Sequence, residues 1–150
     1  GIPIKETLEV LKEAGLGSIS GGGAEIFAKR ARRKIFGDKI TGEEWLQVHE
    51  TAHLIGMKSN ATMLYGHLET VEERSDHLVR LRELQDLAQG FVTFIPLAFH
   101  PENTVLDFLK TSFLSHLAHC LVGFFYATHS FQVEWFLKGG IWNSLNNLLS

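Results

Sequence analysis

KSNATMLYGHLETVEERSDHLVRLRELQDLAQGFVTFIPL, residues 58–97, is the stretch that decides the fold. Its first segment, Lys58 to Leu64, and its last, the compact apolar run Phe91 to Leu97, each have the length and composition of a strand. Between them, Thr70 opens a long helix that runs to about Ala88. Two strands joined by a helix of this length lie parallel in one sheet, as a βαβ unit.

The same alternation continues toward the N-terminus. The sequence predicts a short strand over 16–19 and helices over 4–14, 25–36 and 41–56. Thr41 and Thr70 each have a glutamate three residues later, which is the spacing of a capping box. The chain is therefore expected to be α/β with a parallel sheet. It is either about half of an eight-fold barrel, which needs about 250 residues, or a small open sheet.

In both architectures, ligands bind at the carboxyl ends of the strands. Three predicted loops lie there, Gly21–Glu25, Tyr65–Thr70 and Ala98–Thr104. The first is glycine-rich, so its backbone can approach a ligand closely or simply make a tight turn, and its Glu25 is a candidate for binding a hydroxyl group. His67 and His100, in the other two loops, are predicted to share one site.

The composition excludes some classes of protein. The chain has 14 basic and 17 acidic residues and so lacks the excess of positive charge typical of nucleic-acid binding. Its single cysteine, Cys120, can form neither an internal disulfide nor a cysteine-ligated metal site by itself. Residues 1–20 have no apolar signal-peptide core. A cytoplasmic protein in a reducing compartment is expected.

The last third of the chain differs in composition from the rest. No residue from Ser112 to Val133 is charged, and the segment is long enough to cross a bilayer. However, the segment contains histidines, and no cluster of basic residues flanks it to orient a membrane-spanning helix. A buried segment is therefore expected, and no membrane association. No pattern of acidic residues accompanies these histidines and Cys120, so no metal site is expected there. Phe131 to Leu137 is a candidate fourth strand.

His49-Glu50-Thr51-Ala52-His53 is an H-E-x-x-H sequence on a predicted helix, the pattern of zinc peptidases with Glu50 as general base. Glu72 follows at a spacing that suits a third ligand. However, one whole βα unit would separate it from the two histidines, and the flank of a helix faces away from the strand ends where sites form. Zinc hydrolysis is kept as an alternative function.

Six stretches of the chain together resemble one enzyme family. They are residues 15–19 (GLGSI), 21–27 (GGGAEIF), 43–46 (EEWL), 59–67 (SNATMLYGH), 81–86 (LRELQD) and 94–104 (FIPLAFHPENT). From about residue 5 to residue 104 the chain resembles aminofutalosine (aminodeoxyfutalosine) synthase, the radical S-adenosylmethionine enzyme of the futalosine route to menaquinone. Its sister enzyme, cyclic dehypoxanthine futalosine synthase, is the nearest alternative.

The resemblance implies a (β/α) TIM-type barrel that uses S-adenosylmethionine and a [4Fe–4S] cluster. In the family, the 5′-deoxyadenosyl radical adds to a small-molecule substrate, 3-[(1-carboxyvinyl)oxy]benzoate. The family's three cluster cysteines precede the first residue here, and Cys120 cannot replace them because a cluster needs several thiolates. The resemblance therefore implies a C-terminal half-barrel that cannot bind the cluster and is inactive alone.

Thr62-x-Leu64-x-Gly66-x-x-Glu69 is similar to an element on a middle strand of radical S-adenosylmethionine barrels, with threonine in place of its first glycine. That strand lies near the adenine in the family. The resemblance therefore implies that Leu64 and Gly66 contact the adenosyl group and that Glu69, also part of this cofactor site, supports the loop.

The resemblance gives roles to four further residues. It implies that Glu25 binds the ribose and that Lys39 binds the carboxylate of the methionine moiety. His67 and His100 would face the reaction cavity as catalytic residues.

The chain departs from the family pattern in several places. Ser20 stands in place of a usual proline, and Phe36-Gly37 stands in place of Cys-Pro. Glu50 stands in place of a residue that is commonly arginine in the family. The H-E-x-x-H sequence is therefore interpreted as the result of one substitution in a helix of the family. From about Val105 the match fades. We expect residues 1–104 to form the half-barrel and residues 105–150 a divergent apolar tail, either the last barrel elements or aberrant sequence. An incomplete barrel has an open sheet edge, through which self-association is expected.

Overall fold

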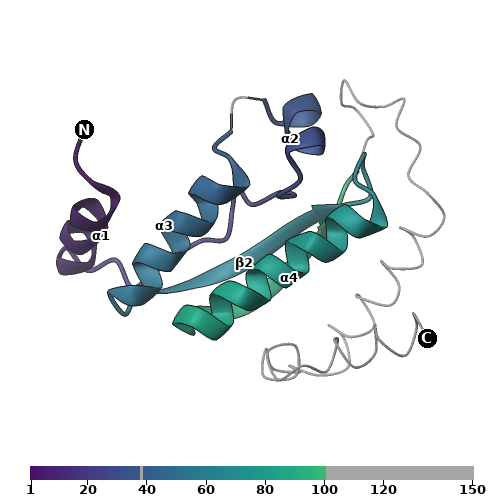
Figure 1. Cartoon of the computed structure of the whole chain (residues 1–150). Helices are drawn as coiled ribbons and strands as arrows, with labels where there is room; N and C mark the ends of the chain where they lie inside the picture. Colours follow the sequence, from purple (N-terminus) through teal and green to yellow (C-terminus); the bar gives the residue numbers. More distant parts are fainter. Residues whose placement is uncertain (38, 101–150) are drawn as a thin grey trace.

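The computed structural model describes residues 1–37 and 39–100 of the chain. In this part, helices and strands follow one another in the order α1 (Ile4–Glu13), β1 (Ser18–Ile19), α2 (Lys29–Ile35), α3 (Gly42–Leu54), β2 (Lys58–Tyr65), α4 (Val71–Ala88) and β3 (Phe91–Ala98). The strands form a parallel sheet in the order β1-β2-β3. Helix α4 runs alongside β2 (Figure 1). The predicted α/β class with a parallel sheet is confirmed.

The β2–α4–β3 unit contains most of the strand pairing. Residues 59–65 of β2 pair in parallel with residues 91–98 of β3. At the start of α4, the Thr70 hydroxyl accepts a hydrogen bond from Glu73 N–H at 3.2 Å, while the Glu73 carboxylate accepts one from Thr70 N–H at 2.8 Å. The helix begins where the sequence places it because this capping box is a local interaction.

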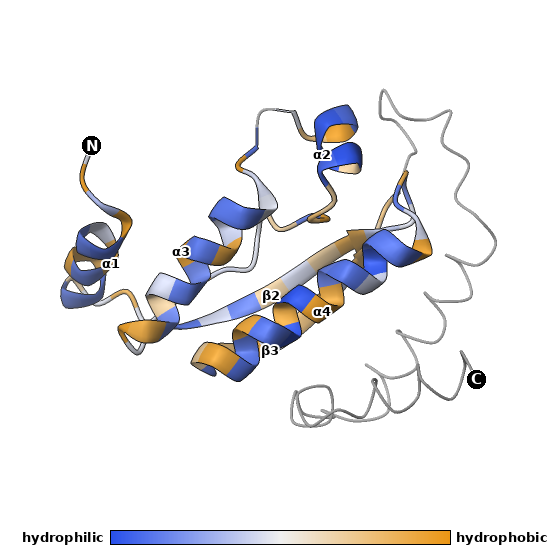
Figure 2. Cartoon of the chain, viewed as in Figure 1, coloured by the Kyte–Doolittle hydropathy of each residue, from blue (hydrophilic) through white to orange (hydrophobic). Residues whose placement is uncertain are grey.

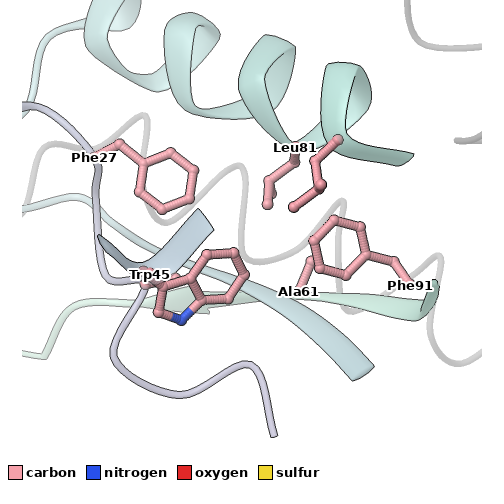
Figure 3. Packing of buried hydrophobic residues seen from close by; sticks show 7 residues of the cluster. Phe27, Trp45, Ala61, Leu81 and Phe91 are labelled. Atoms are coloured by element: carbon pink, nitrogen blue, oxygen red, sulfur yellow. The ribbon is translucent and has the colours of Figure 1, made fainter. Parts of the chain in front are cut away.

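Helices α3 and α4 pack on the same side of the sheet. Trp45 from α3 and Leu81 from α4 share one buried cluster with Phe27, with Ala61 of β2 and with Phe91 of β3 (Figure 3). Hydrophilic residues, blue in Figure 2, alternate with hydrophobic ones along both helices, as expected for helices with one buried face. Strands in sequential order with their helices on one side have the arrangement of consecutive βα units in a barrel.

One predicted helix begins later than the sequence suggests. The helix expected over 25–36 starts at Lys29, because the residues before it lie against β2. The Glu25 carbonyl accepts a hydrogen bond from Leu64 N–H at 2.7 Å, and Ile26 and Phe27 are fully buried. Contacts with a distant part of the chain therefore override the helical pattern here.

Several predictions lie outside the described residues. They are the loop after residue 100, the charge-poor segment 112–133, Cys120, the candidate strand Phe131–Leu137 and the boundary between 1–104 and 105–150. Across residues 1–37 and 39–100, no helix has both the length and the apolar character needed to cross a membrane. β1 and β3 are the outer strands of the sheet in this part of the molecule, and self-association through their edges stays a prediction.

Candidate functional site

The structure brings Glu25, the end of β2 and residues 98–100 together at the carboxyl edge of the sheet. β2 and β3 end side by side at Tyr65 and Ala98, and Phe99 N–H donates a hydrogen bond to the Tyr65 carbonyl at 2.8 Å. Glu25 reaches the same edge through the hydrogen bond between its carbonyl and Leu64 N–H. Side chains from segments far apart in the sequence can therefore contact one ligand here.

Glu25 and Lys39 form an ion pair at this edge. Glu25 has a left-handed backbone, with φ of 46°, and its side chain is 15% exposed, against 48% for that of Lys39. The Lys39 ammonium also lies 5.5 Å from the centroid of the Phe36 ring. An accessible cation beside a carboxylate can bind a ligand that offers an anionic group to one and a hydroxyl group to the other.

The loop after β2 is organised by the buried carboxylate of Glu69. It accepts hydrogen bonds from Gly66 N–H at 2.6 Å, from His67 N–H at 2.9 Å and from the Arg74 guanidinium at 2.7 Å. Burial raises the pKa of Glu69, but these hydrogen bonds outweigh it and hold the pKa below its ordinary value. Glu69 is therefore an ionised anchor of the loop.

The ring of His67 lies within the same loop with no exposed surface. Its Nδ1 accepts a hydrogen bond from Leu68 N–H at 2.7 Å, so Nε2, 3.1 Å from the Leu64 carbonyl, is the protonated nitrogen. Burial lowers the pKa of His67 despite the Glu69 carboxylate. The ring is neutral, and the Glu69 oxygen 3.2 Å from Nδ1 is not an ion-pair partner.

The other predicted site residues flank His67. Leu64 is half-buried near the end of β2, and Gly66 follows with φ of 88°, a conformation that L side chains rarely adopt. The Phe99 ring lies edge-on to the His67 ring, with 6.0 Å between centroids. His100 comes next and is exposed.

The H-E-x-x-H residues lie toward the opposite end of β2. His49 Nδ1 and His53 Nε2 are each 2.8 Å from the Ser59 hydroxyl, and both rings are buried. Glu72 is exposed in the first turn of α4. Within residues 1–37 and 39–100, no group of three or more His, Cys, Asp or Glu side chains could hold a metal ion. The two histidines pack α3 on the sheet, and the geometry gives the zinc alternative no support.

The sequence analysis did not single out two buried polar residues that lie near the site. His77 on α4 accepts a hydrogen bond from Phe27 N–H at Nδ1, 3.2 Å, and its Nε2 lies 2.9 Å from the Thr62 carbonyl. Arg32 on α2 donates hydrogen bonds to several carbonyls of the glycine-rich loop. The available signal for His77 was its place four residues before Leu81, on the apolar face of α4.

Close packing requires a glycine at position 21 of the glycine-rich loop but not at position 22. A Cβ on Gly21 would lie 2.6 Å from the Asn60 carbonyl oxygen and 2.9 Å from Thr62 Cγ2, whereas one on Gly22 would meet only the Ser20 hydroxyl at 3.6 Å. Gly21→Ala is therefore expected to lower the free energy of unfolding by about 2 kcal/mol. Gly22→Ala, the matched control, should change it by less than about 0.5 kcal/mol. Urea denaturation measures both, and equal effects would contradict the predicted close approach.

These features define a class of protein. The chain contains consecutive parallel βα units whose polar, glycine-containing loops meet at the carboxyl edge of the sheet, as in α/β enzymes that bind their ligands there.

Two bacterial enzymes narrow this class. Over 105 residues the chain is 59% identical to the aminodeoxyfutalosine synthase of Thermus thermophilus, a match that covers 70% of the chain and 28% of that enzyme. The synthase of Streptomyces coelicolor is 46% identical over 99 residues, which are 66% of the chain and 26% of that enzyme. The chain is thus related to the aminodeoxyfutalosine synthases, as its motifs predicted, and spans only about a quarter of their length.

A second kind of relative has similar identity. The 5-amino-6-(D-ribitylamino)uracil–L-tyrosine 4-hydroxyphenyl transferase 1 of Methanosarcina mazei is 44% identical over 102 residues, which are 68% of the chain and 27% of that protein. The motifs in the sequence did not indicate this second class. No protein-family model matches the chain.

Proposed function

We propose that the chain is part of an aminodeoxyfutalosine synthase of the cytoplasm. The enzyme would join the 5′-deoxyadenosyl group of S-adenosylmethionine to 3-[(1-carboxyvinyl)oxy]benzoate in menaquinone biosynthesis. The observation that carries the proposal is the 59% identity to the Thermus thermophilus enzyme over 105 residues. In this proposal, residues 1–104 contribute consecutive strands of a (β/α) barrel. The parallel strand order β1-β2-β3 supports that role.

Glu25 and Lys39 are proposed to bind the polar ends of S-adenosylmethionine. Lys39 would bind the carboxylate of the methionine moiety, and Glu25 would accept hydrogen bonds from the ribose hydroxyls. Their mutual ion pair supports these roles, because it holds both groups at the carboxyl edge with Lys39 about half exposed. Ligand binding would replace that ion pair with two charge-assisted hydrogen bonds.

Leu64 and Gly66 are proposed to contact the adenosyl group. The N–H of Gly66 already donates to Glu69, so this glycine would contribute close backbone approach rather than a hydrogen bond. Of the two proposed catalytic histidines, His67 would shape the cavity, since backbone groups occupy both its nitrogens. His100 is the exposed one and would reach the reacting groups.

The described residues fit only part of the cofactor set. Residues 1–37 and 39–100 contain no cysteine, so they do not fit a [4Fe–4S] cluster, whose thiolates would come from elsewhere in the protein. The Glu25–Lys39 pair does fit S-adenosylmethionine, which has a carboxylate and ribose hydroxyls to bind. When bound, S-adenosylmethionine supplies the 5′-deoxyadenosyl group.

The Methanosarcina mazei transferase supports a second candidate function. Its 44% identity nearly equals the 46% of the Streptomyces coelicolor synthase. The chain would then belong to an enzyme that joins 5-amino-6-(D-ribitylamino)uracil to the 4-hydroxyphenyl group of L-tyrosine. Assays with S-adenosylmethionine and the benzoate substrate, and with 5-amino-6-(D-ribitylamino)uracil and L-tyrosine, distinguish these two candidate functions.

A chimera tests the proposal in a full-length enzyme. The matched segment of the Thermus thermophilus synthase is replaced by that of this chain, and aminodeoxyfutalosine formation is measured under anaerobic conditions. We expect an active chimera, in which Lys39→Met raises the KM for S-adenosylmethionine at least about tenfold, because a hydrogen bond between charged groups is worth roughly 1.5–3 kcal/mol. Lys34→Met, on the exposed face of α2, should leave that KM unchanged.

The unmodified 150-residue chain is the second control. By itself it is expected to bind no stoichiometric iron after anaerobic reconstitution and to release no 5′-deoxyadenosine. A chimera that is inactive with the benzoate but active with 5-amino-6-(D-ribitylamino)uracil and L-tyrosine would replace the first candidate function with the second.

A further inference from the structure

Arg32 is a buried cation behind the glycine-rich loop, only 5% exposed. Its Nη1 donates hydrogen bonds to the carbonyl oxygens of Ala24 at 2.6 Å, Ile26 at 3.2 Å and Gly23 at 3.3 Å. Its Nη2 donates to Gly23 at 3.3 Å and to the Ile40 carbonyl. One guanidinium therefore joins three carbonyls of residues 23–26 to the carbonyl of Ile40, just before α3.

The partners of Arg32 are backbone carbonyls rather than a carboxylate. Within the described ranges, no ion pair joins this guanidinium to an acidic side chain. Burial lowers the pKa of Arg32, while the nearby carboxylates of Glu25, Glu43 and Glu44 raise it. None of these carboxylates forms an ion pair with the guanidinium, so the N–H groups of this protonated side chain are satisfied by backbone carbonyls. Arg32 thus fixes the direction of those carbonyls.

Because the carbonyls of Gly23, Ala24 and Ile26 all point at one guanidinium, the chain has to curl around it. The curl is visible at Gly23, with φ of 86°, and at Glu25, with φ of 46°. A left-handed backbone is unfavourable for a glutamate and persists only where surrounding contacts enforce it. Here Arg32 binds the carbonyls on both sides of Glu25, and Leu64 N–H binds the carbonyl of Glu25 itself.

We propose that Arg32 is a positioning residue, which holds residues 23–26 in the curled conformation that places the Glu25 carboxylate beside Lys39 at the carboxyl edge. Arg32 itself would not touch the ligand, since its guanidinium is already hydrogen-bonded to carbonyls behind the loop. The expected effect of Arg32 on ligand binding rests on the ligand-binding role proposed above for Glu25. Its effect on the backbone conformation of residues 23–26 does not depend on that role.

Hydrogen–deuterium exchange of the 150-residue chain tests the conformational part. Arg32→Lys keeps the charge, but one ammonium cannot reach carbonyls in several directions as a planar guanidinium does. We expect the amides of Leu64 and Phe27, which hydrogen-bond across this loop, to exchange at least tenfold faster. The Ser59 amide, bonded to the Gly90 carbonyl at the other end of β2, should keep its rate.

Arg33→Lys is the matched control, because Arg33 is the exposed neighbour on the same helix, and it should change none of these rates. Unchanged exchange at Leu64 and Phe27 in Arg32→Lys would overturn the proposal. Equal acceleration at Ser59 would also overturn it, since that result would mean a general loss of stability.

The chimera with the Thermus thermophilus enzyme tests the functional part. Arg32→Lys and Glu25→Gln should each weaken S-adenosylmethionine binding at least fivefold, and the double variant should bind no more weakly than the worse single variant. Additive losses would show that Arg32 does not act through Glu25. If Glu25→Gln alone changes nothing, the proposed ligand role of Glu25 fails, while hydrogen exchange still decides the role of Arg32 in the loop.

Discussion

Lowering the pH from 7 to 4.5 is expected to unfold the described part of the protein, because His49, His53 and His77 are buried in the neutral form, in addition to His67. Burial lowers the pKa of His49 to about 3, that of His53 to about 4 and that of His77 to about 3. Unfolding returns each ring to water, where its pKa is about 6.5. Below that pH the unfolded chain binds more protons than the folded one, so stability falls as the pH falls.

The expected loss of stability is large. Between pH 6.5 and about 4, each buried histidine lowers the free energy of unfolding by about 1 kcal/mol or slightly more per pH unit. The three together remove roughly 6 to 8 kcal/mol at pH 4.5, comparable with the whole stability of an ordinary domain, about 5–15 kcal/mol. The carboxylate of Glu69 adds to the loss only at lower pH, since its pKa lies below the ordinary value.

Urea denaturation followed by circular dichroism at several pH values measures this effect. His77→Gln removes one titrating ring, and it should reduce the dependence of the unfolding free energy on pH by about a third between pH 6 and 4.5. A free energy of unfolding that stays constant over this range would contradict the burial of the three neutral rings.

Gly90→Ala is expected to destabilise the protein by at least about 3 kcal/mol. A Cβ on Gly90 would lie 1.9 Å from Cγ and 2.0 Å from Cδ2 of the His53 ring. That ring cannot move aside without loss, because its Nε2 is bonded to Ser59 and the Phe91 ring packs edge-on against it, 4.7 Å between centroids. Gly90 therefore allows β3 to begin directly against α3.

The matched control for Gly90→Ala is Gly17→Ala, where no atom lies within 4 Å of the added Cβ. Its effect should stay within about 0.5 kcal/mol. In a His53→Ala background the clash is removed, and Gly90→Ala should cost about 1 kcal/mol or less. If the cost is the same in both backgrounds, the His53 ring is not what excludes a side chain at position 90.

The helix starts and the parallel sheet could be predicted because local interactions decide them. Thr41 with Glu44 and Thr70 with Glu73 form both capping boxes that their spacing indicates. Strands β2 and β3 each end within one residue of their predicted bounds. The 18-residue helix between β2 and β3 is long enough to cross back over the sheet, so the two strands run parallel.

The start of α2 could not be predicted in this way. Residues 25–28 have a composition compatible with a helix, but Glu25 bonds to β2 and Phe27 bonds to His77, 50 positions along the chain. Contacts between residues so far apart have no signal in local periodicity, although they outweigh the small differences in helix propensity. Arg32 and His77 were missed for the same reason.

The sequence by itself determined the α/β class, the parallel direction of the strands and the loops that come at their carboxyl ends, because periodicity and capping act over a few residues. The same reasoning could place Glu25, His67 and Glu69 only at one edge of the sheet. The tertiary structure decided what each group does there: it pairs Glu25 with Lys39, buries Glu69 as an ionised anchor and makes His67 neutral. Those states depend on desolvation and on hydrogen-bond partners from other elements, and both arise only when the chain is folded.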